Sequence, residues 1–384
     1  MSFLSSFVSV LYFTLVDINT YSTWLEIDLN ALKNNVAEVI RMTGREVMAV
    51  IKANGYGHGM RPIAQACVAG GATWCGVARI EEALALRRAG ISNRILVLGF
   101  TPASKIPDAI EHNITIALFN AELAQTYLEY VRIHGGTLRA HVKVETGMGR
   151  LGMPVEVVAP FLRALKNSPI QVEGIFTHFA RADEPDSDST PAQIRLFNSL
   201  LTDLEQQGLK PGVVHAANSA GILNFPSSYY DLTRPGDLIM GMSPIEGKPL
   251  PAQFKPVLTW KARLISLRTF PAGQGISYGS KYVTTKDERI GVIPIGYGDG
   301  FRRVDGQQVL VGGKRVNIVG RVCMDQCMLQ LDSVPDVKIG DEVVLVGRQG
   351  AEFISIDEVA QRWGTINYEV VCGLAERLPR IYIE

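Results

Sequence analysis

The chain has 384 residues, of which 47% are hydrophobic and 20% are charged. That apolar content supplies a large core, which excludes a disordered or fibrous protein, and the length suggests more than one domain. Lys plus Arg and Asp plus Glu both number 38, so the formal net charge is zero. A nucleic-acid-binding protein would carry a basic surplus and a membrane-surface protein a polybasic segment, so neither kind of partner is expected.

The first twenty residues contain an apolar stretch with no Lys or Arg before it. A signal peptide has a positively charged start and a small-residue cleavage site, and neither is evident. The stretch is also short for a transmembrane helix. We expect residues 1–20 to be a disordered extension of a cytoplasmic protein, with an export signal as the alternative.

From residue 47 onward, short β-rich runs alternate with amphipathic helical stretches such as Ile80–Arg88 and residues 193–207. Parallel strands joined by crossover helices give this alternation, and eight units close into a (β/α)8 barrel, with an open doubly wound sheet as the alternative. The strands are predicted at residues 47–53, 73–78, 95–99, 115–119, 139–145, 172–179, 213–219 and 237–242.

After residue 251 the helical periodicity fades, and β-branched runs with Gly-containing turns take over. One helix is predicted at residues 355–363, with Ser355 as N-cap and Glu358 at its third position. The sequence therefore predicts a TIM-type barrel over residues 21–252, followed by a mostly β domain over residues 253–384. Strands of that domain are predicted at residues 258–267, 290–295, 308–311, 315–319 and 342–346.

The five cysteines indicate neither a disulfide framework nor a metal centre. An odd number at low density fits free thiols in a reducing compartment. Cys323 and Cys327 have the spacing of a loose zinc half-site, but no second Cys or His pair lies near them in the sequence to complete four ligands. No metal is therefore expected.

Polar residues follow the predicted strands, where a parallel barrel holds its active site. Lys52 closes the first strand, and a desolvated lysine forms Schiff bases with carbonyl compounds, although a lysine on the barrel rim is the alternative. Arg150 lies on a Gly-rich loop that follows Lys143 and Glu145. Its guanidinium suits a carboxylate or phosphate, or else pairs with Glu145.

Three further strand ends add to this set. His178 ends strand six, and Asn218 and Ser219 end strand seven in a turn that suits an anion. Arg234 precedes strand eight. A lysine, a phosphate nest, two arginines and a histidine at one barrel mouth are the set expected of a pyridoxal phosphate enzyme.

The sequence resembles the alanine racemase family, whose members are fold-type III pyridoxal phosphate enzymes. The resemblance extends from residues 24–28 to residues 367–369. KANGYGHG at residues 52–59 looks like the cofactor-lysine motif, with Gly55 where the family usually has Ala. Seven further motifs follow in order, at residues 148–152, 177–179, 218–219, 234–236, 277–279, 323–326 and 366–369.

The resemblance implies racemisation of L- and D-alanine by two bases, which supplies D-alanine for peptidoglycan. Lys52 would hold the cofactor and act as one base, and Tyr278 from the partner subunit of a homodimer with shared active sites would be the other. Arg150 and the backbone of Met324 would bind the substrate carboxylate. Lys143 corresponds to a lysine that is carbamylated in some relatives.

The resemblance also assigns the cofactor contacts. Arg234 would face the pyridine nitrogen and bond to His178, while most of the other residues would hold the phosphate. The full set is Lys52, Tyr56, His178, Asn218, Ser219, Arg234, Gly236, Asp237 and Tyr368. Asp237 and Met240 depart from the Ile and Tyr usual in the family. An Asp237 side chain that faced the phosphate would repel it, but because the phosphate uses the backbone N–H of residue 237, the site can function with this side chain turned away.

Three rival functions are weighed against this one. A non-catalytic barrel that binds the cofactor would lack the second domain. A decarboxylase of the same two-domain plan would place a carboxylate, not Arg234, against the pyridine nitrogen. A racemase for serine or for a broader range of amino acids is the alternative that the sequence leaves open.

Overall fold

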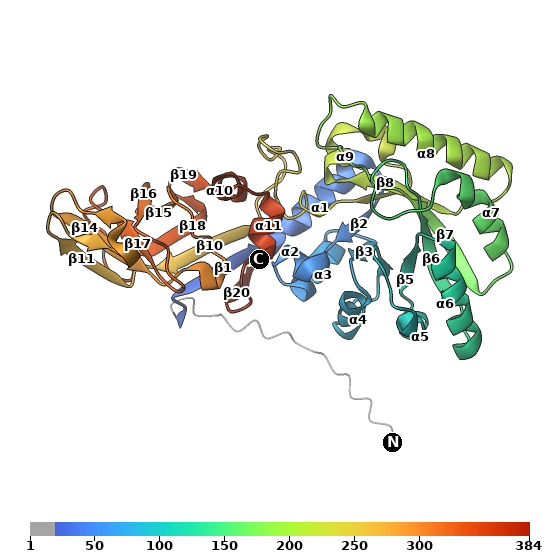
Figure 1. The fold of residues 1–384 in the computed structure, drawn as a ribbon, viewed down its shortest axis with the longest axis horizontal. Helices are drawn as coiled ribbons and strands as arrows, with labels where there is room; N and C mark the ends of the chain where they lie inside the picture. The colour runs from blue at the N-terminus through green and yellow to red at the C-terminus, as the bar shows by residue number, and fades with distance from the viewer. Residues whose placement is uncertain (1–19) are drawn as a thin grey trace, which may run out of the picture.

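The computed structural model describes residues 20–384, which form two domains next to each other along the long axis of the molecule (Figure 1). Apart from Thr20, the extension expected at residues 1–20 lies outside the described residues. No helix within residues 20–384 is long and apolar enough to cross a membrane.

The predicted barrel is confirmed: eight parallel strands pair in chain order, and the last pairs with the first. Met48, Trp74, Leu96 and Leu232 form an apolar cluster of their own, with one residue from each of four strands. The barrel strands are β2 (Glu46–Val50), β3 (Trp74–Val77), β4 (Arg94–Val97), β5 (Thr115–Leu118), β6 (Leu138–Lys143), β7 (Ile170–Phe176), β8 (Val213–Asn218) and β9 (Leu232–Arg234).

Helices surround the barrel (Figure 1), and buried apolar residues of the longer ones pack in the same core as the strands. The first begins at its N-cap Asp28, which accepts the N–H of Ala31 at 2.7 Å, and ends at Gly44 in the left-handed conformation that favours glycine. The helices of this domain are α1 (Leu29–Thr43), α2 (Lys52–Tyr56), α3 (Met60–Ala69), α4 (Ile80–Arg88), α5 (Ile106–Glu111), α6 (Ala121–His134), α7 (Val155–Leu165), α8 (Ser189–Gln206) and α9 (Ser219–Asn224).

The eighth strand is not where the sequence pattern places it. Residues 237–242 form a turn, in which the N–H of Met242 donates to the carbonyl of Asp237 at 3.0 Å, and the strand is β9 instead. The apolar run Leu238–Met240 resembles a buried strand because it packs into the core. The true strand is only three residues long and ends in a buried arginine, so its pattern is not apolar.

The second domain is mostly β, as predicted, and it also takes in the start of the chain. β1 (Thr23–Asp28) falls within the segment 21–252 expected to form the barrel, but it pairs with β10 (Leu258–Arg263) and β20 (Arg380–Ile383) of the C-terminal sheet (Figure 1). The predicted strand at residues 258–267 is two strands, β10 (Leu258–Arg263) and β11 (Ser266–Phe270). The crossing of β1 ties the two ends of the chain into one sheet.

The remaining elements complete this domain. The predicted helix is α10, and the Ser355 hydroxyl caps it by accepting the N–H of Glu358 at 3.0 Å. The elements are β12 (Gly275–Ile276), β13 (Tyr282–Val283), β14 (Glu288–Ile293), β15 (Gln308–Val311), β16 (Lys314–Val319), β17 (Cys327–Gln330), β18 (Glu342–Gln349), β19 (Glu352–Ile354), α10 (Ile356–Trp363), α11 (Asn367–Cys372) and β20 (Arg380–Ile383).

Candidate active site

Lys52 stands where the first barrel strand gives way to a left-handed turn. β2 ends at Val50, so Lys52 lies just beyond the strand rather than closing it, and residues 53–56 all have φ between 52° and 63°. Only glycine adopts this region without strain, so the three non-glycine residues are held there by their surroundings.

Glu82 in α4 holds the same turn from outside. Its carboxylate accepts the N–H of Ala53 at 2.7 Å and those of Ala78 and Arg79 at 2.8 and 3.0 Å. It therefore joins the segments that follow β2 and β3. Glu82 is not among the predicted site residues. The signal that could have found it is an acidic residue in the first turn of a helix that directly follows a strand end.

The surroundings of Lys52 favour the neutral form of its amine. Burial lowers the pKa of Lys52, and the positive charge of Arg150 lowers it further. A lowered pKa leaves more of the neutral amine at neutral pH, which is the form that attacks a carbonyl carbon or removes a proton.

Three hydroxyl groups and a glycine form what we call the hydroxyl cradle: Tyr56, Ser219, Gly236 and Tyr368. Ser219 begins α9, and its Oγ accepts the N–H groups of Gly236 and Leu238 at 3.0 and 3.3 Å. The two tyrosine rings have centroids 6.0 Å apart. A Cβ added at Gly236 would overlap the Tyr56 hydroxyl, so only glycine fits there. Hydroxyl and N–H donors around a small space suit a phosphate group.

Asn218 and Asp237 lie next to the hydroxyl cradle and make different contacts. Asn218 is the N-cap of α9 and accepts the N–H of Gly221 at 2.9 Å. The Asp237 side chain does not turn away but reaches into the cradle: its carboxylate accepts a hydrogen bond from the Tyr368 hydroxyl, and the nearby Ser219 hydroxyl acts to lower its pKa. A buried carboxylate requires donors, and Tyr368 supplies one.

Arg234 is buried at the end of β9 and is held on several sides. Its Nη1 lies 2.9 Å from Nδ1 of His215, and its Nη2 donates to the carbonyls of Thr177 and Ala216 at 2.8 and 2.7 Å. The predicted contact with His178 is present, with 3.2 Å between Nη2 and Nδ1. Burial lowers the pKa of Arg234 to about 9. Burial and the nearby guanidinium hold the pKa of His178 well below its usual range, so this ring is neutral.

The polar side chains of β6, His141 and Lys143, point into the barrel. His141 Nδ1 lies 2.8 Å from Nε2 of His215, which is buried and is not among the predicted site residues. Lys143 lines the site cavity. Burial lowers the pKa of Lys143 to about 8, and the charges of Arg150 and Arg234 act in the same direction.

Glu145 serves the Gly-rich loop rather than the Arg150 side chain. Its carboxylate accepts the backbone N–H groups of residues 147–150 at distances from 2.5 to 3.4 Å. The alternative in which Glu145 pairs with the Arg150 guanidinium is therefore not what the structure has. The Glu145 carboxylate therefore holds the backbone of the Gly-rich loop, and Arg150 lines the cavity.

A cavity of about 280 Å³ brings most of the predicted residues together at the barrel mouth. Tyr278 and Met324 are the two that do not line it: both come from the C-terminal domain and are 69% and 54% exposed. The predicted residues that line it are Lys52, Tyr56, Lys143, Arg150, His178, Asn218, Ser219, Arg234, Gly236, Asp237 and Tyr368.

The loop that carries Tyr278 has an unusual backbone. Ser277 and Ser280 have φ values of 63° and 45°, and the Ser277 hydroxyl donates to the carbonyl of Arg321 at 2.8 Å. Non-glycine residues with positive φ persist only where neighbours hold them, and they concentrate at functional sites. This loop therefore holds Tyr278 in a defined, outward-facing position.

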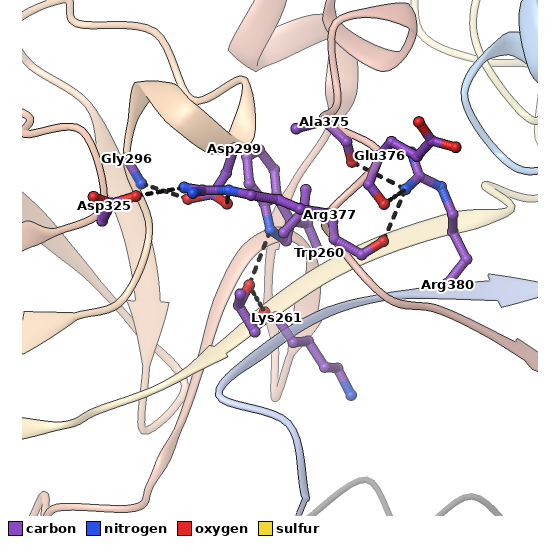
Figure 2. Close-up of polar contacts among 11 residues, drawn as sticks. Trp260, Lys261, Gly296, Asp299, Asp325, Ala375, Glu376, Arg377 and Arg380 are labelled. Carbon is purple, nitrogen blue, oxygen red and sulfur yellow. Dashed lines mark hydrogen bonds and ion pairs between the residues drawn. The ribbon is translucent and has the colours of Figure 1, made fainter.

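The loop that carries Met324 is anchored by the end of the chain (Figure 2). Arg377 Nε donates to Asp299 at 2.7 Å, and its Nη2 donates to Asp325 at 2.7 Å. The Gly298 N–H donates to the carbonyl of Met324 at 2.8 Å. The exposed Met324 is therefore presented from a backbone that is fixed on both sides.

Together, these groups define the chemistry that the cavity can support. It offers an amine to a carbonyl carbon, hydroxyl and N–H donors to a phosphate, and two guanidinium groups to a carboxylate or a ring nitrogen.

Two family models match almost the whole described chain. The alanine racemase N-terminal domain matches residues 27–244, and the alanine racemase C-terminal domain matches residues 257–382. An alanine racemase of Symbiobacterium thermophilum is 43% identical, over 94% of this chain and 97% of its own length. One of Desulforamulus reducens is 44% identical, over 94% of this chain and 98% of its own.

Solved structures agree with these matches. An alanine racemase from E. faecalis has a TM-score of 0.90 at 39% identity and covers 95% of this chain and 99% of its own. The alanine racemase of Bacillus anthracis with bound L-Ala-P has a TM-score of 0.89 at 39% identity, covering 94% and 95%. Both domains are therefore matched in sequence and in structure, and the chain belongs to the alanine racemase family of isomerases.

Proposed function

We propose that this chain interconverts L-alanine and D-alanine with pyridoxal phosphate, in a homodimer whose two active sites each draw residues from both chains. The observation that carries the proposal is the barrel-mouth cavity, which joins the Lys52 amine, the hydroxyl cradle and Arg234. The product D-alanine would serve peptidoglycan synthesis.

The cavity suits this cofactor group by group. Lys52 would bond its aldehyde carbon, and the hydroxyl cradle would hold its phosphate, which Gly236 allows to approach closely. Arg234 would face the pyridine nitrogen. A guanidinium group can only donate hydrogen bonds, so this nitrogen would stay unprotonated. When bound, the cofactor supplies a conjugated ring that draws electron density from the α-carbon.

Inversion at one carbon requires a base on each side of it. Lys52 Nζ would remove or return the α-proton on one face, aided by a pKa that burial lowers. Tyr278 of the partner subunit would act on the opposite face. Arg150 would hold the substrate carboxylate through two hydrogen bonds, and the backbone of Met324 would add another contact.

Subunit complementation tests the shared sites. Lys52→Ala and Tyr278→Phe homodimers should each be nearly inactive. Random pairing after co-refolding of an equal mixture should give about half heterodimers, each with one intact site, so activity should return to roughly a quarter of the wild-type value. No recovery despite demonstrated subunit exchange would mean that one chain supplies both bases.

Substrate assays test the reaction itself. Purified protein loaded with pyridoxal phosphate should racemise alanine faster than serine or lysine, as measured by chiral chromatography of the products. Faster turnover of serine, or equal turnover of all three, would assign the chain to a serine or broad-range racemase instead.

A further inference from the structure

Asp237 is a buried carboxylate inside a site proposed to bind a phosphate. The residue is 2% exposed and lines the cavity directly after Gly236. A negative charge in such a place repels a phosphate group rather than attracting it. The resemblance to the family does not account for this residue, because relatives usually carry an apolar residue here.

Two donors of the hydroxyl cradle are already engaged. Tyr368 has one hydroxyl proton and donates it to the Asp237 carboxylate, and the nearby Ser219 hydroxyl acts to lower the pKa of that carboxylate. The N–H groups of Gly236 and Leu238 donate to Ser219 Oγ. A phosphate that enters the cradle therefore meets a Tyr368 hydroxyl that points at Asp237, and this donor can serve only one of the two acceptors.

Within residues 20–384, no cationic group lies close enough to Asp237 to form an ion pair with it. Lys52 and Tyr56 of α2 and Tyr368 of α11 interact electrostatically with Asp237. Cys372, also of α11, lies near Lys52. Lys52 is the cationic member of this set, and in the proposed function its amine is bonded to the cofactor. Burial raises the pKa of Asp237, although its hydrogen bonds act against this.

We propose that Asp237 sets the affinity of this site for the cofactor phosphate by competing with it for the Tyr368 hydroxyl, and that Asp237 takes up a proton when the phosphate binds. Once protonated, the carboxyl group no longer repels the phosphate, and its O–H becomes a donor to it. This inference rests on the proposed function and adds a pH-dependent control of cofactor loading.

Binding of pyridoxamine phosphate to the full-length, cofactor-stripped protein tests the proposal. This probe lacks the aldehyde and cannot bond Lys52, so its affinity reports the non-covalent contacts. At pH 8, Asp237→Asn should bind it roughly tenfold more tightly than wild type, or better, because one negative charge is removed from beside the phosphate. The advantage should shrink toward onefold as the pH falls and the wild-type carboxyl becomes protonated before binding.

Two controls make the result specific. Pyridoxamine, which has no phosphate, should bind wild type and Asp237→Asn with similar affinity. Asp183→Asn removes the same charge from an exposed residue near Tyr368 and should leave both affinities unchanged.

Calorimetry supplies a second readout that needs no variant. The heat of pyridoxamine phosphate binding, measured in buffers of different ionisation enthalpy, should show uptake of about one more proton than pyridoxamine binding does. Equal proton uptake for the two ligands, or an Asp237→Asn affinity equal to or weaker than wild type at pH 8, would overturn the proposal. Wild type that binds neither pyridoxamine phosphate nor pyridoxal phosphate would instead overturn the proposed function.

Discussion

The predicted site residues are gathered in a cavity at the barrel mouth but are exposed on the loops of the C-terminal domain. At the barrel mouth, Lys52, Lys143 and Arg234 line one cavity, and burial lowers the pKa of each. On the C-terminal domain, Tyr278 and Met324 are exposed and away from that cavity. The same domain also supplies Tyr368 to the cavity, so distance along the chain is not the cause. A single chain therefore gathers the residues proposed to bind the cofactor into one cavity and exposes the two proposed to act in the partner's site.

The sharpest test of this contrast is Tyr278→Phe. We expect turnover in both directions to fall by about 10³-fold, within the range for loss of a general acid or base. Cofactor binding and thermal stability should not change, because the Tyr278 side chain is 69% exposed. Racemisation assays, cofactor absorbance and melting curves measure the three quantities.

A matched control exists in the same domain. Tyr297 is also exposed, at 47%, and Tyr297→Phe removes the same hydroxyl type from a nearby surface. It should keep turnover within about threefold of wild type, since surface substitutions usually have small effects. A Tyr278→Phe enzyme with near-normal turnover would show that the second base lies elsewhere.

Gly236→Ala is the most direct test of the residues proposed to bind the cofactor. An alanine Cβ there would overlap the Tyr56 hydroxyl, so Gly236→Ala should weaken cofactor binding by about 100-fold, which matches an overpacking cost of roughly 2–3 kcal/mol. Gly212→Ala is the control, because its Cβ would meet no atom closer than 3.8 Å. Equilibrium dialysis with the cofactor measures both. Unchanged affinity in Gly236→Ala would remove the hydroxyl cradle from the cofactor site.

Periodicity in the sequence predicts the barrel well and its closing strand badly. Seven of the eight strands lie within a few residues of their expected positions, because buried parallel strands are nearly continuous apolar runs. β9 escapes this rule, since it is only three residues long and ends in a buried arginine. β1 is not among the predicted strands, and only its tertiary pairing shows which sheet it joins.

For the candidate site, motifs identify the residues and miss their partners. The structure brings eleven of the predicted residues to one cavity, yet the contact partners Glu82 and His215 have no motif of their own. The direction of a side chain also lies beyond sequence reasoning. Asp237 enters the cradle, where the Tyr368 hydroxyl from a distant segment donates to it.

A smaller effect concerns Lys143, which we propose to be carbamylated. Carbamate formation joins CO₂ to the neutral amine and releases a proton. With a pKa of about 8, the amine is mostly charged below pH 7 and mostly neutral above pH 9. At pH 8.5, added bicarbonate should raise activity by roughly fivefold over CO₂-free buffer, equivalent to ~1 kcal/mol from fixing Arg150 by charge-assisted hydrogen bonds. At pH 6 bicarbonate should have little effect.

Lys143→Arg is the matched variant, since it keeps the charge but cannot be carbamylated. Its activity should not respond to bicarbonate at either pH. Electron density for an unmodified lysine in crystals grown at pH 8.5 with bicarbonate would reject the carbamate.

The smallest expected effects lie in the left-handed turn after Lys52, where two neighbours should respond in opposite directions. Gly55→Ala introduces the residue usual in relatives at φ +63°, with its Cβ 3.3 Å from Ile63, and should cost about 0.5–1 kcal/mol of stability. Ala53→Gly relieves a comparable strain at φ 52° but adds freedom to the unfolded chain, so it should gain less than about 1 kcal/mol. Melting curves at fixed cofactor concentration compare the two, because bound cofactor itself shifts the transition. If both substitutions lower stability equally, the strain at residues 53–56 is not what sets the conformation around Lys52.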